Sequence, residues 1–238
     1  MKKLIMCVAL TLGCALAGES RTNEETSWGW SPIGLGIAAP AQLPFVESSV
    51  YGFRFGGFFG WNYDVYGLDL GLAEVCSGHF AGVQLCALSH TSGNAYGLQL
   101  GVLGNVVERR GVALQLGCVN IDSDEFGGVQ AGLVNYTMNY AGGQFGLVNW
   151  NLSDAYGFQF GAVNVNRNEY FGGAFGVINH SAKFRGFDLG LINTAYEVSG
   201  FQLGLINACD HLKGVQFGLI NMVCEGPLPI MVLANASF

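Results

Sequence analysis

The sequence is poor in charged residues, in proline and in long apolar runs. Only 11% of its 238 residues are charged, against about 25% in typical soluble domains. Five prolines beside 37 glycines exclude both collagen and proline-rich disorder. Ten basic residues face 17 acidic ones, so the chain lacks the basic surface on which nucleic-acid binding depends. No run of about 20 apolar residues follows the N-terminal segment, which excludes a transmembrane helix there.

Residues 1–17 have the anatomy of a secretory signal. Lys2 and Lys3 precede an apolar stretch over 4–12, and Ala15-Leu16-Ala17 forms a small-residue cleavage site. A competing interpretation makes Cys14 the site of a lipid anchor. Residues 18–31 are polar and aperiodic, which predicts a flexible leader. We therefore expect an exported protein whose residues 32–238 form a single β-repeat domain.

That domain is built from one repeated phrase of eight slots, seen clearly at 157–164 (GFQFGAVN). Twelve units follow one another at a nearly constant spacing, with no linker between them. They begin at Gly52, Gly67, Gly82, Gly97, Ala113, Gly128, Gly142, Gly157, Gly172, Gly186, Gly200 and Gly214. A sustained period of this kind indicates a repeat architecture.

The slots alternate between two kinds of side chain. Slots two and four are apolar or glycine, slots one and five are almost always glycine, and slot three is usually glutamine. Strict alternation predicts a β-strand with one apolar and one polar side, whereas so many glycines would destabilise a helix. Slot seven breaks the alternation, and slot eight is asparagine from Asn120 onward, which suits a strand exit.

Slot three supplies the candidate functional residues, because charge as well as glutamine is tolerated there. We expect this side of the strands to meet water or a lumen. The candidates are Arg54, Asp69, Gln84, Gln99, Gln115, Gln130, Gln144, Gln159, Asp188, Gln202 and Gln216. Other acidic residues, Asp122 among them, read as solvated turn residues. Cys209 and Cys224 lie about one repeat apart and are a possible disulfide, subject to geometry.

Three ways of closing the repeats compete. The expected fold is all-β, with about 12 to 14 short strands closed into an antiparallel barrel, because strands of about ten residues can cross a bilayer at a tilt. A β-solenoid with one coil per repeat explains the identical units, but the drifting period and one-sided apolar strands count against it. A ring of hairpins is third, because the loops are short for a second strand.

Two parts of the sequence resemble known proteins, and the first is the C-terminus. Alternating apolar residues from Ile230 end in Phe238, as the last strands of bacterial outer-membrane barrels do. Residues 32–238, with their GxQxGxxN units and the opening at 50–54 (VYGFR), also resemble a family of uncharacterised exported bacterial surface-repeat proteins. That resemblance implies no activity, ligand or catalytic residue.

The sequence therefore predicts a non-catalytic protein of the outer membrane or cell surface, with a structural or small-pore role and bacterial outer-membrane lipid as its partner. The alternative is a secreted or surface-tethered scaffold that acts as a binding or adhesion module. No nucleophile and base stand out together, and no Cys/His spacing resembles a zinc site. We expect no enzyme activity, cofactor, metal or nucleic-acid partner, and the surface ligand is left open.

Overall fold

A computed structural model describes residues 29–226 and 229–237. The predicted signal segment, most of the leader, Cys14 and Phe238 lie outside the described residues. The described residues form thirteen strands. They are β1 (Trp30–Ala38), β2 (Ala41–Leu43), β3 (Ser49–Asn62), β4 (Val65–Cys76), β5 (Phe80–Thr91), β6 (Ala95–Val107), β7 (Gly111–Ala131), β8 (Val134–Phe145), β9 (Val148–Asn151), β10 (Ala155–Leu189), β11 (Ile192–Leu203), β12 (Ile206–Val223) and β13 (Ile230–Ser237).

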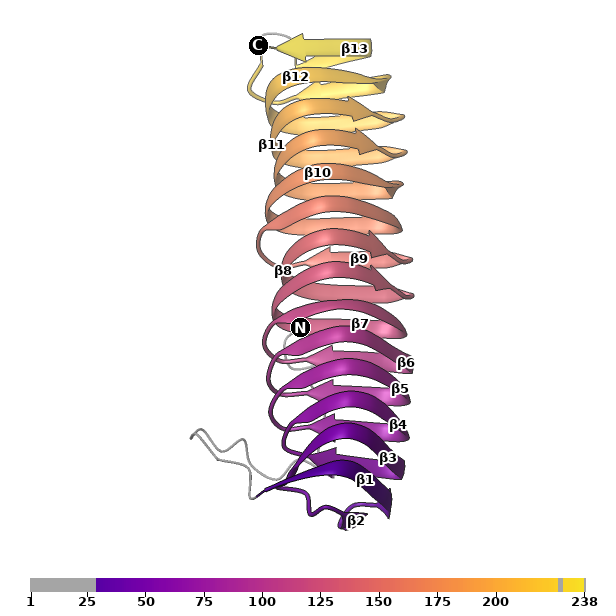
Figure 1. The fold of residues 1–238 in the computed structure, drawn as a ribbon. Helices are drawn as coiled ribbons and strands as arrows, with labels where there is room; N and C mark the ends of the chain where they lie inside the picture. The colour runs from indigo at the N-terminus through magenta and orange to yellow at the C-terminus, as the bar shows by residue number, and fades with distance from the viewer. Residues whose placement is uncertain (1–28, 227–228, 238) are drawn as a thin grey trace.

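The chain winds into a β-solenoid, a rod of stacked coils with one repeat in each coil (Figure 1). Equivalent slots of successive repeats pair side by side in parallel, as Gln84 with Gln99 and Gly186 with Gly200. The predicted antiparallel barrel is therefore wrong, and the solenoid alternative fits. The hairpin ring fails too, because the antiparallel pairs among the described strands are β1 with β2 and β12 with β13, at the two ends.

Eleven of the twelve units have glycine at the first slot, for a steric reason. Gly157 has φ of +122°, a region that L side chains rarely adopt, and a Cβ there would collide with the carbonyl oxygen of Gly142 in the coil below. Ten of the other eleven first-slot residues are also glycines with positive φ; the exception is Ala113. The stacking of one backbone directly on the next explains this requirement.

The drift of the repeat length is absorbed by irregularities within the coils. The parallel registers shift between Phe55 and Gly57, between Gly101 and Gly104, and between Asp122 and Glu125. At each place an extra residue leaves the ladder as a bulge, and pairing resumes beyond it. The variable spacing that counted against a solenoid is therefore compatible with one.

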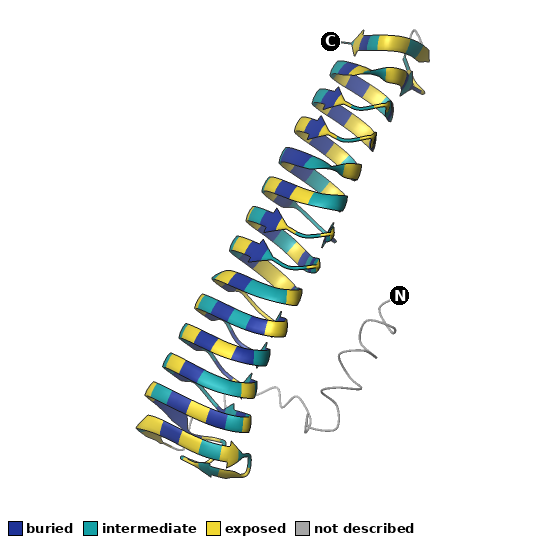
Figure 2. Ribbon diagram, turned by 90° about the vertical axis from the view of Figure 1, so that its right-hand side faces the viewer, coloured by how far each residue is buried: buried dark blue, intermediate teal, exposed yellow. Residues whose placement is uncertain are grey.

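The strands turn their polar side inward. Figure 2 shows buried and exposed residues recurring at the same places in successive coils. Gln159 and Asn164 are fully buried, whereas Phe158 and Phe160 are 57% and 40% exposed. A more conventional core runs beside these amides, formed by inward residues such as Phe126, Tyr170 and Val198. The rod is thus largely polar inside and apolar outside.

Candidate functional site

The slot-three residues lie in one row inside the rod, called here the glutamine row, which consists of two runs. From Gln99 to Gln159 each glutamine donates from Nε2 to Oε1 of the glutamine in the preceding coil, as Gln159 does to Gln144 at 2.9 Å and Gln144 to Gln130 at 2.9 Å. The run continues down to Gln84, which donates to Asp69 at 2.8 Å. Ala174 interrupts it, and a second run begins at Asp188.

A second buried row runs the opposite way. It consists of Asn105, Asn120, Asn135, Asn149, Asn164, Asn179, Asn193, Asn207 and Asn221. Each asparagine donates from Nδ2 to Oδ1 of the next one toward the C-terminus, at 2.8 Å from Asn149 to Asn164. The same Nδ2 also donates to a backbone carbonyl of the next coil, that of Phe160 at 3.1 Å for Asn149. Because the two rows have opposed amide dipoles, neither builds up an uncompensated field along the rod.

The two rows are possible only because their amides find partners in the neighbouring coils. A buried amide without a partner costs about 1–3 kcal/mol, whereas stacked side-chain amides bond to copies of themselves. Gln159 also exchanges hydrogen bonds across the interior with Asn166, at 3.1 Å and 2.9 Å. The slot-five glycines leave room for these amides, since a Cβ on Gly161 would lie 2.8 Å from Nδ2 of Asn149.

A buried ionic cluster begins the glutamine row. Arg54 donates to both carboxylate oxygens of Asp69 at 2.6 Å, and its Nη2 lies 2.9 Å from Oε2 of Glu74. Burial would lower the pKa of Arg54, but the charge and hydrogen bonds of Asp69 raise it. Burial raises the pKa of Glu74 to about 8 although Arg54 opposes this, since Asp69 is also close. A protonated Glu74 therefore leaves the cluster neutral.

Two further carboxyl groups are buried. Asp122 accepts hydrogen bonds from Gln115 at 3.3 Å and from Gln130, and burial raises its pKa well above the usual value. Burial also raises the pKa of Asp188, to about 8, with Gln202 opposing the shift. Asp122 is therefore an interior residue, and its interpretation as a solvated turn residue was wrong.

The structure brings all eleven sequence-predicted polar residues together. Arg54, Asp69, Asp188 and the eight glutamines are each at most 1% exposed. They line no barrel lumen, because there is no barrel and their own side chains fill the interior. Cys209 and Cys224 lie in adjacent coils, with Cys224 N donating to Cys209 O at 2.9 Å. Both are free thiols, Cys209 buried and Cys224 exposed, so the possible disulfide is not formed.

The outward residues at slots two, four, six and seven form the apolar wall. Slot six follows the slot-five glycine, where the chain bends from one side of the coil to the other, and its row is the apolar edge of the rod. Its large side chains are 46–59% exposed. They are Leu72, Val102 with the adjacent Leu103 at the bulge of its coil, Leu133, Leu147, Val177, Leu191, Leu205 and Leu219. No charged residue occupies any of these four slots in the twelve units.

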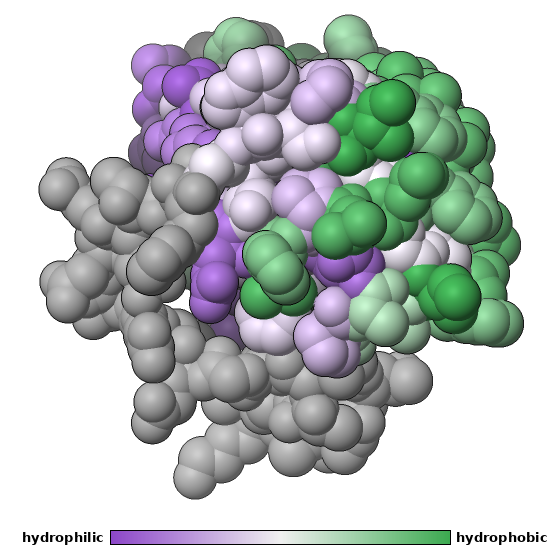
Figure 3. Space-filling view, turned by 60° about the horizontal axis from the view of Figure 1, so that its bottom comes forward, coloured by the Kyte–Doolittle hydropathy of each residue, from purple (hydrophilic) through white to green (hydrophobic). Residues whose placement is uncertain are grey.

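Phenylalanine rings reinforce the wall toward the C-terminal half. Phe145 stacks on Phe160 with centroids 5.2 Å apart, and Phe160 on Phe175 at 4.7 Å. Phe187 stacks on Phe201 at 5.1 Å. Figure 3, which brings the β1–β2 end forward, shows hydrophobic residues gathered along one side and hydrophilic ones along another.

The opposite edge of the rod is polar and is called here the polar edge. Ion pairs link neighbouring coils along it, such as Arg110 with Glu125 at 3.6 Å, and Lys183 with Glu169 at 3.9 Å and Glu197 at 4.0 Å. These pairs are about half exposed, so each contributes little stability. In cross-section the coil is therefore amphipathic, with the apolar edge opposite the polar edge.

The described residues contain no group of three His, Cys, Asp or Glu side chains that could hold a metal ion. The same residues form no helix long and apolar enough to cross a membrane. Comparison with protein-family models, curated proteins and solved structures finds no match.

The sequence interpretation missed two sets of residues. Glu74 occupies the place of the asparagine in its repeat and was not singled out, although its alignment with Asn105 through Ser89 was visible. Arg185 and Lys213, the residues before the first slot of their units, were also missed. Only the pairing of successive coils shows that they share one surface row with Ser199.

Proposed function

We propose that this chain is an exported, non-catalytic surface scaffold that lies on lipid by its apolar wall and presents its polar edge to water. The observation that supports this most directly is the cross-section of the coil. Half-exposed leucines and phenylalanines cover two adjacent faces and the edge between them in successive coils. A continuous apolar surface of this length marks an interaction site.

The shape of the wall favours lipid over a second protein. A flat partner could cover one face but would leave the edge and the other face in water, whereas a fluid apolar phase covers all three. Burying a large aliphatic side chain fully contributes about 1.5–3 kcal/mol, so the half-exposed side chains of the apolar edge would together contribute on the order of 10 kcal/mol. That is the physics of interfacial amphipathic elements.

The net charge of the protein indicates which lipids its apolar wall needs for binding. The formal charge of −7 gives no general attraction to anionic membranes. The apolar wall should therefore bind membranes of zwitterionic lipid. The small-pore role considered from sequence depended on a barrel lumen and is not proposed.

The test is flotation of the folded protein with phosphatidylcholine vesicles. The variant Leu147→Lys/Leu205→Lys puts two charges on the apolar edge, and Ser123→Lys/Asn168→Lys puts the same two on the polar edge. We expect wild type and the polar-edge variant to float and the apolar-edge variant to lose at least about tenfold in vesicle affinity, since charge in an apolar phase is costly.

Two outcomes would overturn the proposal. One is a wild-type protein that never floats with vesicles. The other is a wild-type protein that forms oligomers without binding vesicles and becomes monomeric when the apolar edge is charged, which would make a second copy the occupant of the wall. Far-UV circular dichroism of each variant verifies that the coils are intact.

A further inference from the structure

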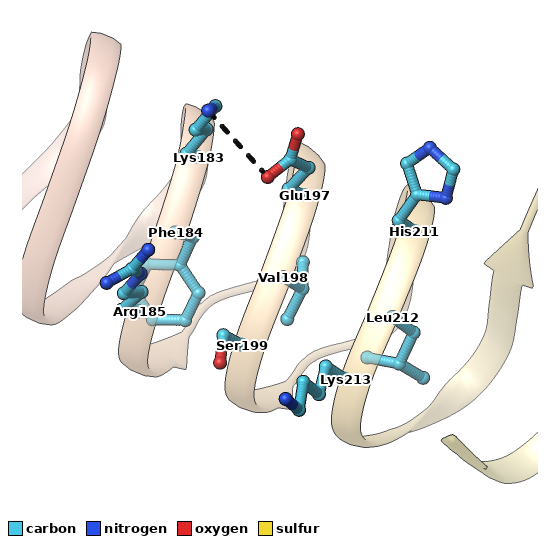
Figure 4. Close-up of a pocket in the computed structure, with 9 residues that line it drawn as sticks. All are labelled: Lys183, Phe184, Arg185, Glu197, Val198, Ser199, His211, Leu212 and Lys213. Atoms are coloured by element: carbon cyan, nitrogen blue, oxygen red, sulfur yellow. Dashed lines mark ion pairs between the residues drawn. The ribbon is translucent and has the colours of Figure 1, made fainter. Parts of the chain in front are cut away.

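A shallow groove of about 610 Å³ crosses three coils near the C-terminal end of the rod. Its floor is the backbone around Phe184, Val198 and Leu212, whose side chains point inward. Lys183, Glu197 and His211 stand on one side, and Arg185, Ser199 and Lys213 on the other (Figure 4). Parallel pairing fixes each of these trios in one row.

The second trio is a change in a row that is otherwise mostly aromatic or apolar. The residue before slot one in the nine earlier units is aromatic, small or apolar: Tyr51, Tyr66, Ala81, Tyr96, Val112, Gly127, Ala141, Tyr156 and Phe171. In the last three units it becomes Arg185, Ser199 and Lys213. Adjacent strands lie about 4.8 Å apart, so the two cations are separated by about 10 Å at their Cα atoms and can converge on one anion over the serine.

The cations of this row are not neutralised by any described residue. Within the described part of the chain, no ion pair forms at Arg185 or Lys213, whereas Lys183 is bridged to Glu169 and Glu197, and His211 lies 3.4 Å from Glu225. The groove holds three cations and one carboxylate in a chain with a formal charge of −7. An uncompensated cationic pair in an acidic protein points to an anionic ligand.

The position of Arg185, Ser199 and Lys213 beside the apolar wall indicates the kind of anion that the groove binds. Phe187 and Phe201 lie two residues after Arg185 and Ser199 in the sequence. Their rings stack on each other at slot two, the first slot of the apolar wall. A molecule bound here would have its anionic group on Arg185, Ser199 and Lys213 and its apolar part along those rings. Arginine and lysine pair with phosphate oxygens through charge-assisted hydrogen bonds.

We propose that this groove binds the phosphate headgroup of an anionic amphiphile such as a phospholipid. The proposal rests on the proposed function, because it places the groove at the border where the wall enters lipid. The apolar wall alone binds zwitterionic lipid, and the groove adds a preference for lipids with an anionic phosphate headgroup.

The experiment compares phosphatidylcholine vesicles with the same vesicles containing phosphatidic acid. The groove variant is Arg185→Gln/Lys213→Gln, and the control Arg109→Gln/Arg110→Gln removes two exposed cations from the polar edge in the middle of the rod. Wild type and the control should bind the phosphatidic acid vesicles roughly tenfold to thirtyfold more tightly than the groove variant. All three should bind pure phosphatidylcholine equally.

Equal losses in the control and groove variants would overturn the groove as a site, because they would indicate diffuse surface charge. If inorganic phosphate alone, titrated by calorimetry, saturates the wild-type groove as tightly as soluble dihexanoyl phosphatidic acid does, the ligand is a free anion and the proposal fails. Dihexanoyl phosphatidic acid also separates the two proposals, because it reports on the groove without a membrane. If the protein does not bind vesicles but binds this short lipid through Arg185 and Lys213, the proposed membrane binding by the apolar wall is refuted and the proposed groove site is supported.

Discussion

At the residue scale, a buried carboxyl group stands at the start of each glutamine run. A carboxyl group offers acceptor oxygens, so it suits the end of a run such as 84–159, in which each glutamine donates toward the N-terminus. Asp69 receives Gln84 and is neutralised by Arg54. Asp188 has no arginine beside it, and its Oδ1 lacks a hydrogen-bond partner among the described residues. Asp188 is therefore the weaker terminus.

This difference predicts a pH-dependent stability. The folded pKa of Asp188 is raised to about 8 by burial, above its unfolded value of about 3.9. Between these values the unfolded chain is ionised while the folded one holds a proton. The free energy of unfolding should therefore fall with rising pH in this window, by at most about 1.4 kcal/mol per pH unit for this group, and level off above it.

The variant Asp188→Asn should reduce that slope, because its amide does not ionise. Glu74, whose pKa is also raised to about 8, should keep part of the slope in place. Urea unfolding at about pH 5 and about pH 7.5 measures the effect, with Asp154→Asn on the polar edge as the matched control. A slope that Asp188→Asn leaves unchanged would show that Asp188 is not the titrating group.

At the scale of the element, each strand holds the rod together by its polar side. We expect Gln159→Ala to lower the free energy of unfolding by about 2–3 kcal/mol, because it removes the buried hydrogen bonds of Gln159 to Gln144 and Asn166 and leaves a cavity in the row. Phe158→Ala should cost less than about 1 kcal/mol, since that ring is 57% exposed and its neighbours in the row are Gly143 and Gly173.

Urea unfolding of both variants in the absence of lipid gives the comparison. The conventional ranking, in which loss of a phenylalanine costs more than loss of a glutamine, would contradict the arrangement of the strands. Vesicle binding should follow the reverse order, with Phe158→Ala the weaker binder, because that ring belongs to the apolar wall.

The sequence predicted the strands but not their closure. Alternation along 157–160 defines a strand with two sides whether the next unit runs parallel or antiparallel to it, so a barrel and a solenoid share the pattern. Two signals did favour the solenoid. Units in opposite directions should show a two-repeat modulation that the sequence lacks, and Val163 and Ile178 at slot seven break the alternation because the chain bends between slots five and seven.

The candidate row was placed by the sequence, but its surroundings were not. Gln159 and its equivalents could be grouped because they share a slot, and Glu74 could be placed by the slot it shares with the asparagines, whereas only the course of the coil shows that Asp122 is interior. The groove is harder still, since Arg185 and Lys213 belong to units two repeats apart. They meet only because parallel pairing stacks the three coils in one register, with Ser199 between the two cations.

At the scale of the whole molecule, the rod is nearly one-dimensional, because each coil contacts only its two neighbours and the ends are covered. The antiparallel strands β2 and β13 close the two ends, where an open parallel edge would invite another chain to pair. In such arrays stability is approximately a sum of coil and interface contributions. The fold should therefore tolerate the loss of a whole coil, but not a shift of register within a coil.

Deletion of 157–171 removes one whole coil and joins Tyr156 to Gly172. We expect this variant to fold, because Gln144 would meet Ala174, as Gln159 does now, and Asn149 would continue the asparagine row at Asn179. Its unfolding midpoint should decrease only modestly.

Deletion of 157–163 removes half a coil, which moves outward side chains into the amide rows. This variant should not fold, because a slip of register inverts every side chain beyond it. Far-UV circular dichroism and resistance to proteolysis separate the two variants. Equal damage from both deletions would mean that the coils are not independent units, whereas survival of the half-coil variant would mean that the buried amide rows do not determine the register.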